Sequence, residues 1–251
     1  MTDPGYRIFS TDPGLRAWAD AARPIAEARA QEPARRAREL RHGGTWLVGL
    51  DLLPNAPDGS IAGFPLVGDW RAEVPPLPLH PAQVSIIYPG YPRRDPDESL
   101  PNHRFRRDRG AAHVDGLLPQ GPDKRRFAAE FHAYILMIPL NEMTRAPTVI
   151  WEGSHVIMGD ALRTAIGNRD PREVDVTDAY KEARRHCFEH CRKVPLACAP
   201  GQAVLIHRHA LHGTDPWGDA SEPSAPEGRM IAFLRPETSA ETWLSAASRW
   251  G

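Results

Sequence analysis

The sequence has few cysteines, almost no net charge and no long apolar run, and each shortage excludes a class of protein. Its 251 residues include 31 basic and 32 acidic side chains, so the formal net charge of −1 gives no reason to expect binding to nucleic acid or to an anionic membrane surface. No apolar stretch approaches the length of a membrane span, and the N-terminus has no signal-peptide pattern. We therefore expect a cytoplasmic protein that acts on a small molecule.

The three cysteines, Cys187, Cys191 and Cys198, are an odd number without the spacing of a disulfide framework, which fits a reducing compartment. On a helix, residues four apart share one face, so Cys187 with Cys191, or His186 with His190, could chelate zinc, with Cys198 as a further ligand. The chain lacks the CxxC spacing of common zinc sites, which favours buried packing of these cysteines instead.

The 26 prolines are scattered, which indicates a loop-rich β architecture rather than a disordered tail. Residues 1–13 are expected to form an irregular lead, and the pattern from Gly14 to Leu40 is helical, with breaks expected at Pro24 and Pro33. Apolar runs then predict short strands at Thr45–Leu53, Val84–Tyr88, Phe131–Leu140, Thr148–Trp151, Ala203–His207 and Met230–Leu234.

Two further helices are expected, one over 158–167 and one from an N-cap at Thr177 to about Cys191. These elements predict a mainly β protein with flanking helices, a double-sheet jelly roll. We expect one domain over 1–251, with a helical N-terminal part at about 13–42, a jelly-roll core at about 45–237 and a helical insertion at about 158–192.

A charged segment, residues 93–110, contains Arg104, Arg106, Arg107 and Arg109. A solvated loop and strand edge is the interpretation that we favour, because charge runs ordinarily face water. The alternative is a cationic lip beside a binding site, which would suit an acidic substrate.

The chemistry-bearing pattern begins with His113 and Asp115. Residues at i and i+2 of a strand point to the same face, so this imidazole and carboxylate can reach one metal ion together. A distant histidine would complete a set of two histidines and one carboxylate, which leaves three coordination positions open, as non-heme Fe(II) oxygenases require. His207, His209 and His212 are the candidates for that third ligand.

Four segments resemble the phytanoyl-CoA dioxygenase family in order and approximate spacing: HVD at 113–115, PTVIWEGSH at 147–155, APGQAVLIHRHALHGT at 199–214 and GRMIAFLRPE at 228–237. The resemblance covers roughly residues 84–237. It implies a double-stranded β-helix (jelly roll) that uses Fe(II), 2-oxoglutarate and O2. In two places the chain departs from the family: the segment between His212 and Arg229 is longer, and Arg145-Ala146 replaces an Asn-Gly.

The resemblance also implies roles for individual residues: iron binding by His113, Asp115 and His212, and cosubstrate binding by Arg229, Thr214 and Tyr134. An arginine suits the distal carboxylate of 2-oxoglutarate because its planar fork grips a carboxylate with two hydrogen bonds. His209 is the alternative third ligand, and Arg235 is the alternative carboxylate clamp. His155 is expected to be structural.

The expected reaction is decarboxylation of 2-oxoglutarate to succinate and CO2, coupled to hydroxylation of an unactivated C–H bond. Family members that halogenate have a small residue at the position of Asp115, so Asp115 argues for hydroxylation. A CoA thioester, a free acid, an amino acid and a secondary metabolite all stay open as substrates. The alternatives are a non-catalytic jelly-roll protein that binds a metal or small ligand, and a cupin-like metalloenzyme without 2-oxoglutarate.

Overall fold

Antiparallel strands form the core of the computed structural model, which describes residues 3–218, 227–246 and 250. Within these residues seven strands make a large sheet, in the order β1 (Tyr6–Ile8), β10 (Val204–His207), β7 (Tyr134–Pro139), β12 (Arg229–Leu234), β4 (Gln83–Ile87), β3 (Trp46–Leu47) and β2 (Leu40–Arg41). A smaller sheet has the order β11 (His212–Thr214), β8 (Thr148–Trp151) and β9 (Lys193–Leu196), and β5 (Leu117–Gln120) pairs with β6 (Arg125–Ala128). The prediction of a mainly β protein with helices is confirmed.

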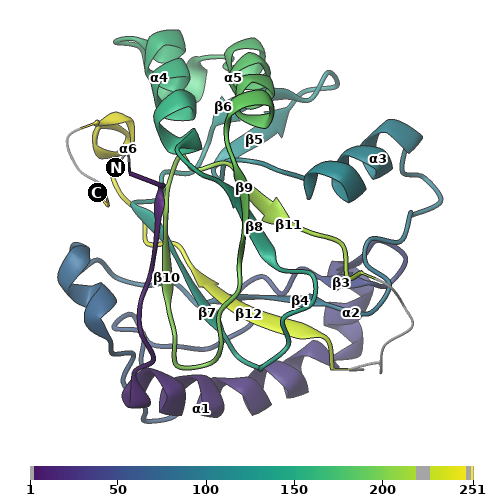
Figure 1. Cartoon of the computed structure of the whole chain (residues 1–251), viewed down its shortest axis with the longest axis vertical. Coiled ribbons are helices and arrows are strands. Elements are labelled where there is room, and N and C mark those ends of the chain that lie inside the picture. Colours follow the sequence, from purple (N-terminus) through teal and green to yellow (C-terminus); the bar gives the residue numbers. More distant parts are fainter. Residues whose placement is uncertain (1–2, 219–226, 247–249, 251) are drawn as a thin grey trace.

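The two faces of the large sheet pack against different layers (Figure 1). Along β12, Ala232 and Leu234 join the apolar cluster that includes Trp18 of helix α1 (Pro13–Ala30). Ile231 and Phe233 point the other way, into a cluster shared with Ile150 of the smaller sheet. This alternation follows from the two-residue repeat of a strand, and it places one face of β12 between the two sheets.

The N-terminal part differs from the prediction in two places. The expected irregular lead contains β1, which pairs with β10 at the edge of the large sheet. Pro24 lies inside α1 rather than ending it, and its position on the exposed side leaves the carbonyl that it cannot bond open to water. Pro33, as predicted, restarts the chain as helix α2 (Pro33–Glu39).

Residues 100–109 of the charged segment form a helix, α3 (Leu100–Arg109), so the predicted strand edge is wrong there, whereas residues 93–99 form a loop and the segment is largely exposed, as predicted. The Ser99 side chain caps the first turn by accepting from Asn102 N, and Gly110 ends the helix in the left-handed conformation. Both are ordinary helix boundary signals. Its arginines do not line the large cavity described below, so they give no support to an acidic substrate.

The helical insertion consists of α4 (Ser154–Ile166), the short 3-10 turn Pro171–Glu173 and α5 (Thr177–His190), and it packs on the outer face of the smaller sheet (Figure 1). Thr177 is the first residue of α5 rather than its N-cap; its hydroxyl donates to Asp175. A second 3-10 turn, Asp69–Glu73, and helix α6 (Ala240–Leu244) complete the described elements. Among the helices in the described ranges, none is long and apolar enough to cross a membrane.

The predicted strand Thr45–Leu53 shrinks to β3 because the chain turns at Gly49, where φ is +64°. A Cβ on Gly49 would lie 2.1 Å from Val84 O, so only glycine allows this close approach to β4. The β5–β6 hairpin and β9 were not predicted. The other predicted strands appear with boundaries shifted by a few residues.

Candidate metal and cosubstrate site

His113 and His212 are brought together by the backbone. Each residue's N–H donates to the other's carbonyl, at 2.9 Å and 3.1 Å, so that the segment after α3 pairs with β11. Gly213 makes this pairing possible, because a Cβ at this position would lie 2.3 Å from Gly110 O. The glycine after His212 therefore has a structural reason: the chain at the end of α3 crosses directly over it.

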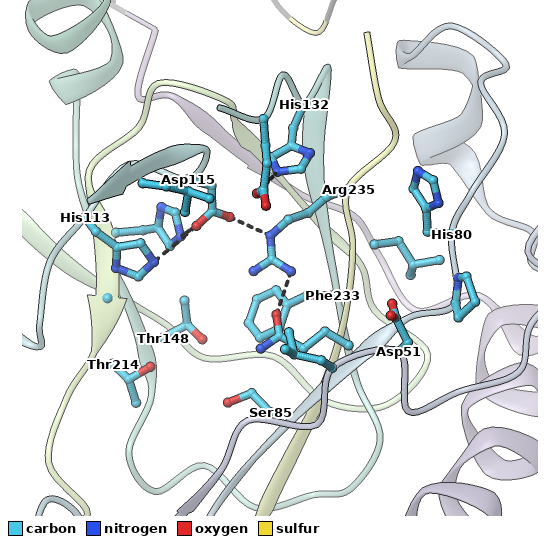
Figure 2. A pocket seen from close by; sticks show the side chains of 18 of the residues that line it. Asp51, His80, Ser85, His113, Asp115, His132, Thr148, Thr214, Phe233 and Arg235 are labelled. Carbon is cyan, nitrogen blue, oxygen red and sulfur yellow. Dashed lines mark hydrogen bonds and ion pairs between the residues drawn. The ribbon is translucent and has the colours of Figure 1, made fainter. Parts of the chain in front are cut away.

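The side chains of His113, Asp115 and His212, called the triad below, converge on one point. Figure 2 shows His113 and Asp115 of this group. One potential ligand atom from each lies within 4.8 Å of the other two. Asp115 Oδ1 lies 3.1 Å from His113 Nε2 and 3.6 Å from His212 Nε2. The Asp115 side chain points to the same side of the chain as that of His113, as the HxD spacing predicted.

Hydrogen bonds to the backbone fix both imidazoles. His113 Nδ1 lies 3.0 Å from Ala111 O, and His212 Nδ1 lies 3.0 Å from Ala210 O. A carbonyl only accepts, so each Nδ1 carries a proton, and Nε2 is the ring nitrogen that faces the Asp115 carboxylate. This arrangement, in which one ring nitrogen donates to the protein and the other faces the ion, is the usual one for a metal-binding histidine.

The charges at the triad also suit a cation. Burial alone would raise the pKa of Asp115, but Arg235 and the two histidines outweigh it and hold that pKa well below its usual value. Burial lowers the pKa of His212 to about 4, against the opposing effect of Asp115. The site therefore presents an ionised carboxylate and a neutral imidazole, the protonation states that metal binding requires. The donor set fits a divalent ion such as Fe(II).

A cavity of about 540 Å³ opens beside the triad (Figure 2). That volume lies within the range of roughly 300–1,000 Å³ that is usual for small-molecule sites. Ser85, Thr148 and Thr214 contribute hydroxyls to its lining, and Phe233 contributes an aromatic face. Thr148 and Thr214 are directly paired across β8 and β11, so the two hydroxyl residues lie next to each other on the same side of the smaller sheet.

Arg229 lies behind Thr148. Its side chain is only 2% exposed, and its Nη1 donates to Thr148 Oγ1 at 3.2 Å. Its Nε and Nη2 have no hydrogen-bond partner within the described residues, although both are buried. Burial lowers the pKa of Arg229 to about 10, and Tyr91 opposes this shift. A buried cation with unused donors is costly unless an anion joins it, so this position calls for an anionic ligand.

Arg229 does not itself line the large cavity; it borders a small void of about 10 Å³ beside Cys198. Thr148 separates the two spaces, so an anion at the cavity floor would meet the threonine hydroxyls first and the guanidinium directly behind them.

Arg235 lies in the cavity next to the triad (Figure 2). Its Nε donates to Asp115 Oδ2 at 2.5 Å, and its Nη1 donates to Gln83 Oε1 at 2.7 Å. Arg229 is the first residue of β12 and Arg235 directly follows the last. Arg235 is held by the triad carboxylate, whereas Arg229 has unused hydrogen-bond donors.

Comparisons with known proteins find likeness among solved structures. No family model matches the sequence, and no curated protein matches it significantly. Solved structures that resemble the chain include SnoK, a non-heme α-ketoglutarate-dependent carbocyclase from nogalamycin biosynthesis, with 16% identity, a TM-score of 0.47, and coverage of 94% of this chain and 80% of SnoK. AviO1 from Streptomyces viridochromogenes Tue57 has 14% identity, a TM-score of 0.45 and coverage of 95% and 92%.

EctD from S. alaskensis with bound Fe has 15% identity, a TM-score of 0.45, and coverage of 94% of this chain and 73% of EctD. Likeness at this level leaves the chemistry of the present chain to be inferred from its own residues.

The expectation that Tyr134 lies near a cosubstrate is wrong. Tyr134 belongs to the apolar cluster between the large sheet and α1, together with Leu136, and it does not line the cavity. Its neighbour Ile135 points between the sheets instead. Both faces of β7 are buried, so the apolar pattern of the sequence does not tell which face meets the cavity. Burial raises the pKa of Tyr134 to about 12.

The other histidines lie apart from the triad. His209, the alternative third ligand, is fully buried, with its ring edge-on to Trp243 at 4.6 Å between centroids. The His207 ring lies beside it, with ring centroids 5.5 Å apart, and the tilted His155 ring lies 4.7 Å from the His207 ring between centroids. Of the three candidates, the structure therefore brings only His212 to the HxD pair, within the described residues.

The cysteines do not assemble a second metal site in the described part of the chain, where the triad is the group that brings three possible ligand atoms together. Cys187 is buried in the cluster under α5, and burial raises its pKa to about 12. His186 and His190 stack on the exposed side of the helix, 4.1 Å apart between centroids. This arrangement supports the packing interpretation over zinc.

Proposed function

We propose that this chain is an Fe(II)- and 2-oxoglutarate-dependent dioxygenase of the phytanoyl-CoA dioxygenase type. Its core would be a double-stranded β-helix built from the two facing sheets, in one domain over residues 1–251. The observation that carries the proposal is a pair of unmet binding requirements, one at the cavity and one directly behind the Thr148 side chain that lines it. The triad offers three ligands to a cation, and Arg229 offers buried donors to an anion. 2-Oxoglutarate meets both, because one end chelates a metal and the other is a carboxylate.

In this proposal His113, Asp115 and His212 hold Fe(II) through two Nε2 atoms and one carboxylate oxygen. Thr148 and Thr214 donate hydrogen bonds to the distal carboxylate of 2-oxoglutarate, and Arg229 neutralises its charge from behind. Because Thr148 Oγ1 already accepts from Arg229, its own proton is free to donate toward the cavity. Tight packing between the sheets keeps water from the buried end.

Bound iron, with 2-oxoglutarate and O2, would supply the oxidation that releases succinate and CO2 and hydroxylates a C–H bond. The chain's own contribution is to orient the cosubstrate and to leave room beside it for a small-molecule substrate. Phe233 and Leu118 line that remaining space with apolar surface, and Arg235 adds a cation. The identity of the substrate is left to a screen of small molecules.

Anaerobic titration with 2-oxoglutarate tests the proposal directly. Fe(II)-loaded protein should develop a metal-to-ligand charge-transfer absorption band as 2-oxoglutarate chelates the iron. The band should be absent in His212→Ala, which lacks a ligand, and should need more 2-oxoglutarate in Arg229→Met. A protein that binds iron but shows no band, and whose O2 uptake 2-oxoglutarate never stimulates, would instead be a metal-binding module or a cupin-like enzyme.

A further inference from the structure

A chain of three hydrogen bonds links the large sheet to one oxygen of Asp115. Gln83 Nε2 donates to Val48 O at 2.9 Å, which fixes the amide on β4. Gln83 Oε1 then accepts from Arg235 Nη1 at 2.7 Å, and Arg235 Nε donates to Asp115 Oδ2 at 2.5 Å. Figure 2 shows Arg235 next to the carboxylate of Asp115, with Phe233 beside it.

Arg235 has little freedom to leave this position. Its guanidinium carbon lies 5.1 Å from the centre of the Phe233 ring, and its side chain is 21% exposed. The guanidinium is planar and its donors form a rigid fork, so contacts at two of its nitrogens fix the orientation of the whole group. Gln83 and Phe233 thus hold the arginine against Asp115 from the side of the large sheet.

The two oxygens of Asp115 consequently have different surroundings. Oδ1 faces the two imidazoles, whereas Oδ2 is occupied by Arg235. A free carboxylate can bind a metal through one oxygen or through both. Because Arg235 already holds Oδ2, Asp115 can present only Oδ1 to a metal ion.

We infer that Arg235 is a positioning residue that makes Asp115 a one-oxygen ligand and so keeps a metal coordination position open for 2-oxoglutarate. The inference rests on the proposed function. With two imidazoles and one oxygen bound, three positions of an octahedral ion stay open; a second oxygen from Asp115 would take one of them. Removing Arg235 should therefore harm chelation of the cosubstrate more than binding of the metal.

Two effects on the metal itself oppose each other. Loss of an outer-shell partner costs roughly 10–100-fold in metal affinity, whereas removal of a cation close to a divalent ion relieves electrostatic repulsion. For Arg235→Met we expect these to offset, with a metal Kd that changes by less than about tenfold. The signature of the positioning role is thus a split: metal affinity is nearly kept while affinity for a chelating ligand is lost.

Oxalate is the probe that isolates this effect. It chelates a metal through two oxygens, as the keto acid end of 2-oxoglutarate does, but it has no distal carboxylate and so does not need Arg229. Co(II)-loaded protein is titrated with oxalate by calorimetry, and the Co(II) absorption spectrum reports coordination number. Arg235→Met should bind oxalate at least about tenfold more weakly, since a blocked coordination position must first be freed. Arg235→Lys should restore part of the loss, and Gln83→Leu should show a smaller one.

Arg229→Met is the matched control, because it removes an arginine from the first position of β12, whereas Arg235 directly follows the last. It should bind oxalate like the wild type while binding 2-oxoglutarate more weakly. If Arg235→Met binds oxalate as tightly as the wild type with an unchanged Co(II) spectrum, the positioning role is overturned while the proposed function stands. If wild-type protein binds Co(II) no better than His212→Ala does, the proposed function itself fails. Should Arg235→Met lose its cooperative melting transition, Arg235→Lys and Gln83→Leu carry the test.

Discussion

Two arginines in this molecule are almost equally buried, and they differ in what satisfies them. Arg208 is 1% exposed and Arg229 is 2% exposed. The guanidinium of Arg208 donates to four backbone carbonyls, at 2.9–3.3 Å: those of Ala133, Thr242, Trp243 and Ser245. Arg229 donates to one threonine hydroxyl, and two of its nitrogens are unused within the described residues.

The histidines around the two arginines repeat the contrast. His207 and His209 flank Arg208 in the sequence and are enclosed by aromatic rings and apolar packing. His113 and His212 face a carboxylate at the edge of a cavity, with their Nε2 atoms directed toward it. Similar residue types therefore serve packing in one region and ligand binding in the other. For the two arginines the difference lies in whether the protein supplies the hydrogen-bond partners; the ring nitrogens of His209 have none within the described residues, and its ring is held by packing.

The largest effect that we expect is the difference in stability between a variant that lacks Arg208 and one that lacks Arg229. Arg208→Met leaves four backbone carbonyls without this donor, and should lower the free energy of unfolding by about 3–5 kcal/mol, since each buried acceptor left unsatisfied costs about 1–3 kcal/mol. Arg229→Met removes a buried cation with unused donors, so it should leave that free energy unchanged or raise it. Urea denaturation of the two variants measures both. Equal destabilisation would mean that Arg229 is structural as well.

The histidines sharpen the comparison through metal binding. His212→Ala should weaken Co(II) or Fe(II) binding by at least about 100-fold, since even outer-shell changes cost 10–100-fold. His209→Ala should change it by less than about threefold, because its ring lies against Trp243 and outside the triad. Calorimetric titration of folded protein gives both values. The reverse ranking would show that the third ligand is His209.

Some of this contrast could be read from the sequence, and the reasons are local. The HxD spacing spans three residues, so it indicated His113 and Asp115 before any fold was known, and the family resemblance of segment 199–214 indicated His212 as the third ligand. The helix α3 also had local signals, a serine cap and a terminal glycine, which the charge of the segment obscured. Tyr134 was misplaced because both faces of its strand are buried.

The contacts of Arg235 could not be predicted in the same way. Its partners Asp115 and Gln83 lie 120 and 152 residues away in the sequence. They meet because Phe233 pairs with Gln83 across β12 and β4, a register that no short motif encodes. The unused donors of Arg229 are likewise a property of packing rather than of sequence.

A third prediction concerns the selectivity of the cavity. Arg229→Met should weaken 2-oxoglutarate binding by at least about tenfold, because a charge-assisted hydrogen bond contributes about 1.5–3 kcal/mol and each factor of ten corresponds to about 1.4. Arg229→Lys should recover only part, since an ammonium lacks the planar fork. Thr214→Ala should cost less, as it removes one neutral donor. Arg208→Lys, if it folds, is the comparison variant and should bind 2-oxoglutarate normally.

The ratio of 2-oxoglutarate affinity to oxalate affinity separates this effect from that of Arg235. The Arg229 variants and, to a smaller extent, Thr214→Ala should lower the ratio, because these variants lose contacts to the distal carboxylate, whereas Arg235→Met should not lower it. If Arg235→Ala lowers it more than Arg229→Ala does, the clamp is Arg235 and the assignment of the two arginines is reversed.

The smallest effect that we expect is a pH dependence of the free energy of unfolding that comes from His207 and His209, the two histidines that flank Arg208. Burial lowers the pKa of His207, as does neighbouring His209, and burial followed by the charge of Arg208 lowers the pKa of His209 well below its usual value. Both rings stay neutral in the fold, while the unfolded chain takes up protons below about pH 6.5. The neutral rings therefore contribute fully to the free energy of unfolding above that pH. This free energy decreases as the pH falls, by about 0.8 kcal/mol per histidine at pH 6.0.

Urea denaturation of apo protein at pH 7.5 and 6.0 measures the loss, and His209→Gln should show a loss smaller by about that 0.8 kcal/mol. The exposed His186→Gln variant is the control for removing one ionisable group elsewhere. A pH response in His209→Gln equal to that of the wild type would mean that His209 takes up its proton without unfolding. The surroundings of Arg208 would then be open to water, and they would no longer differ in this respect from the cavity beside the triad.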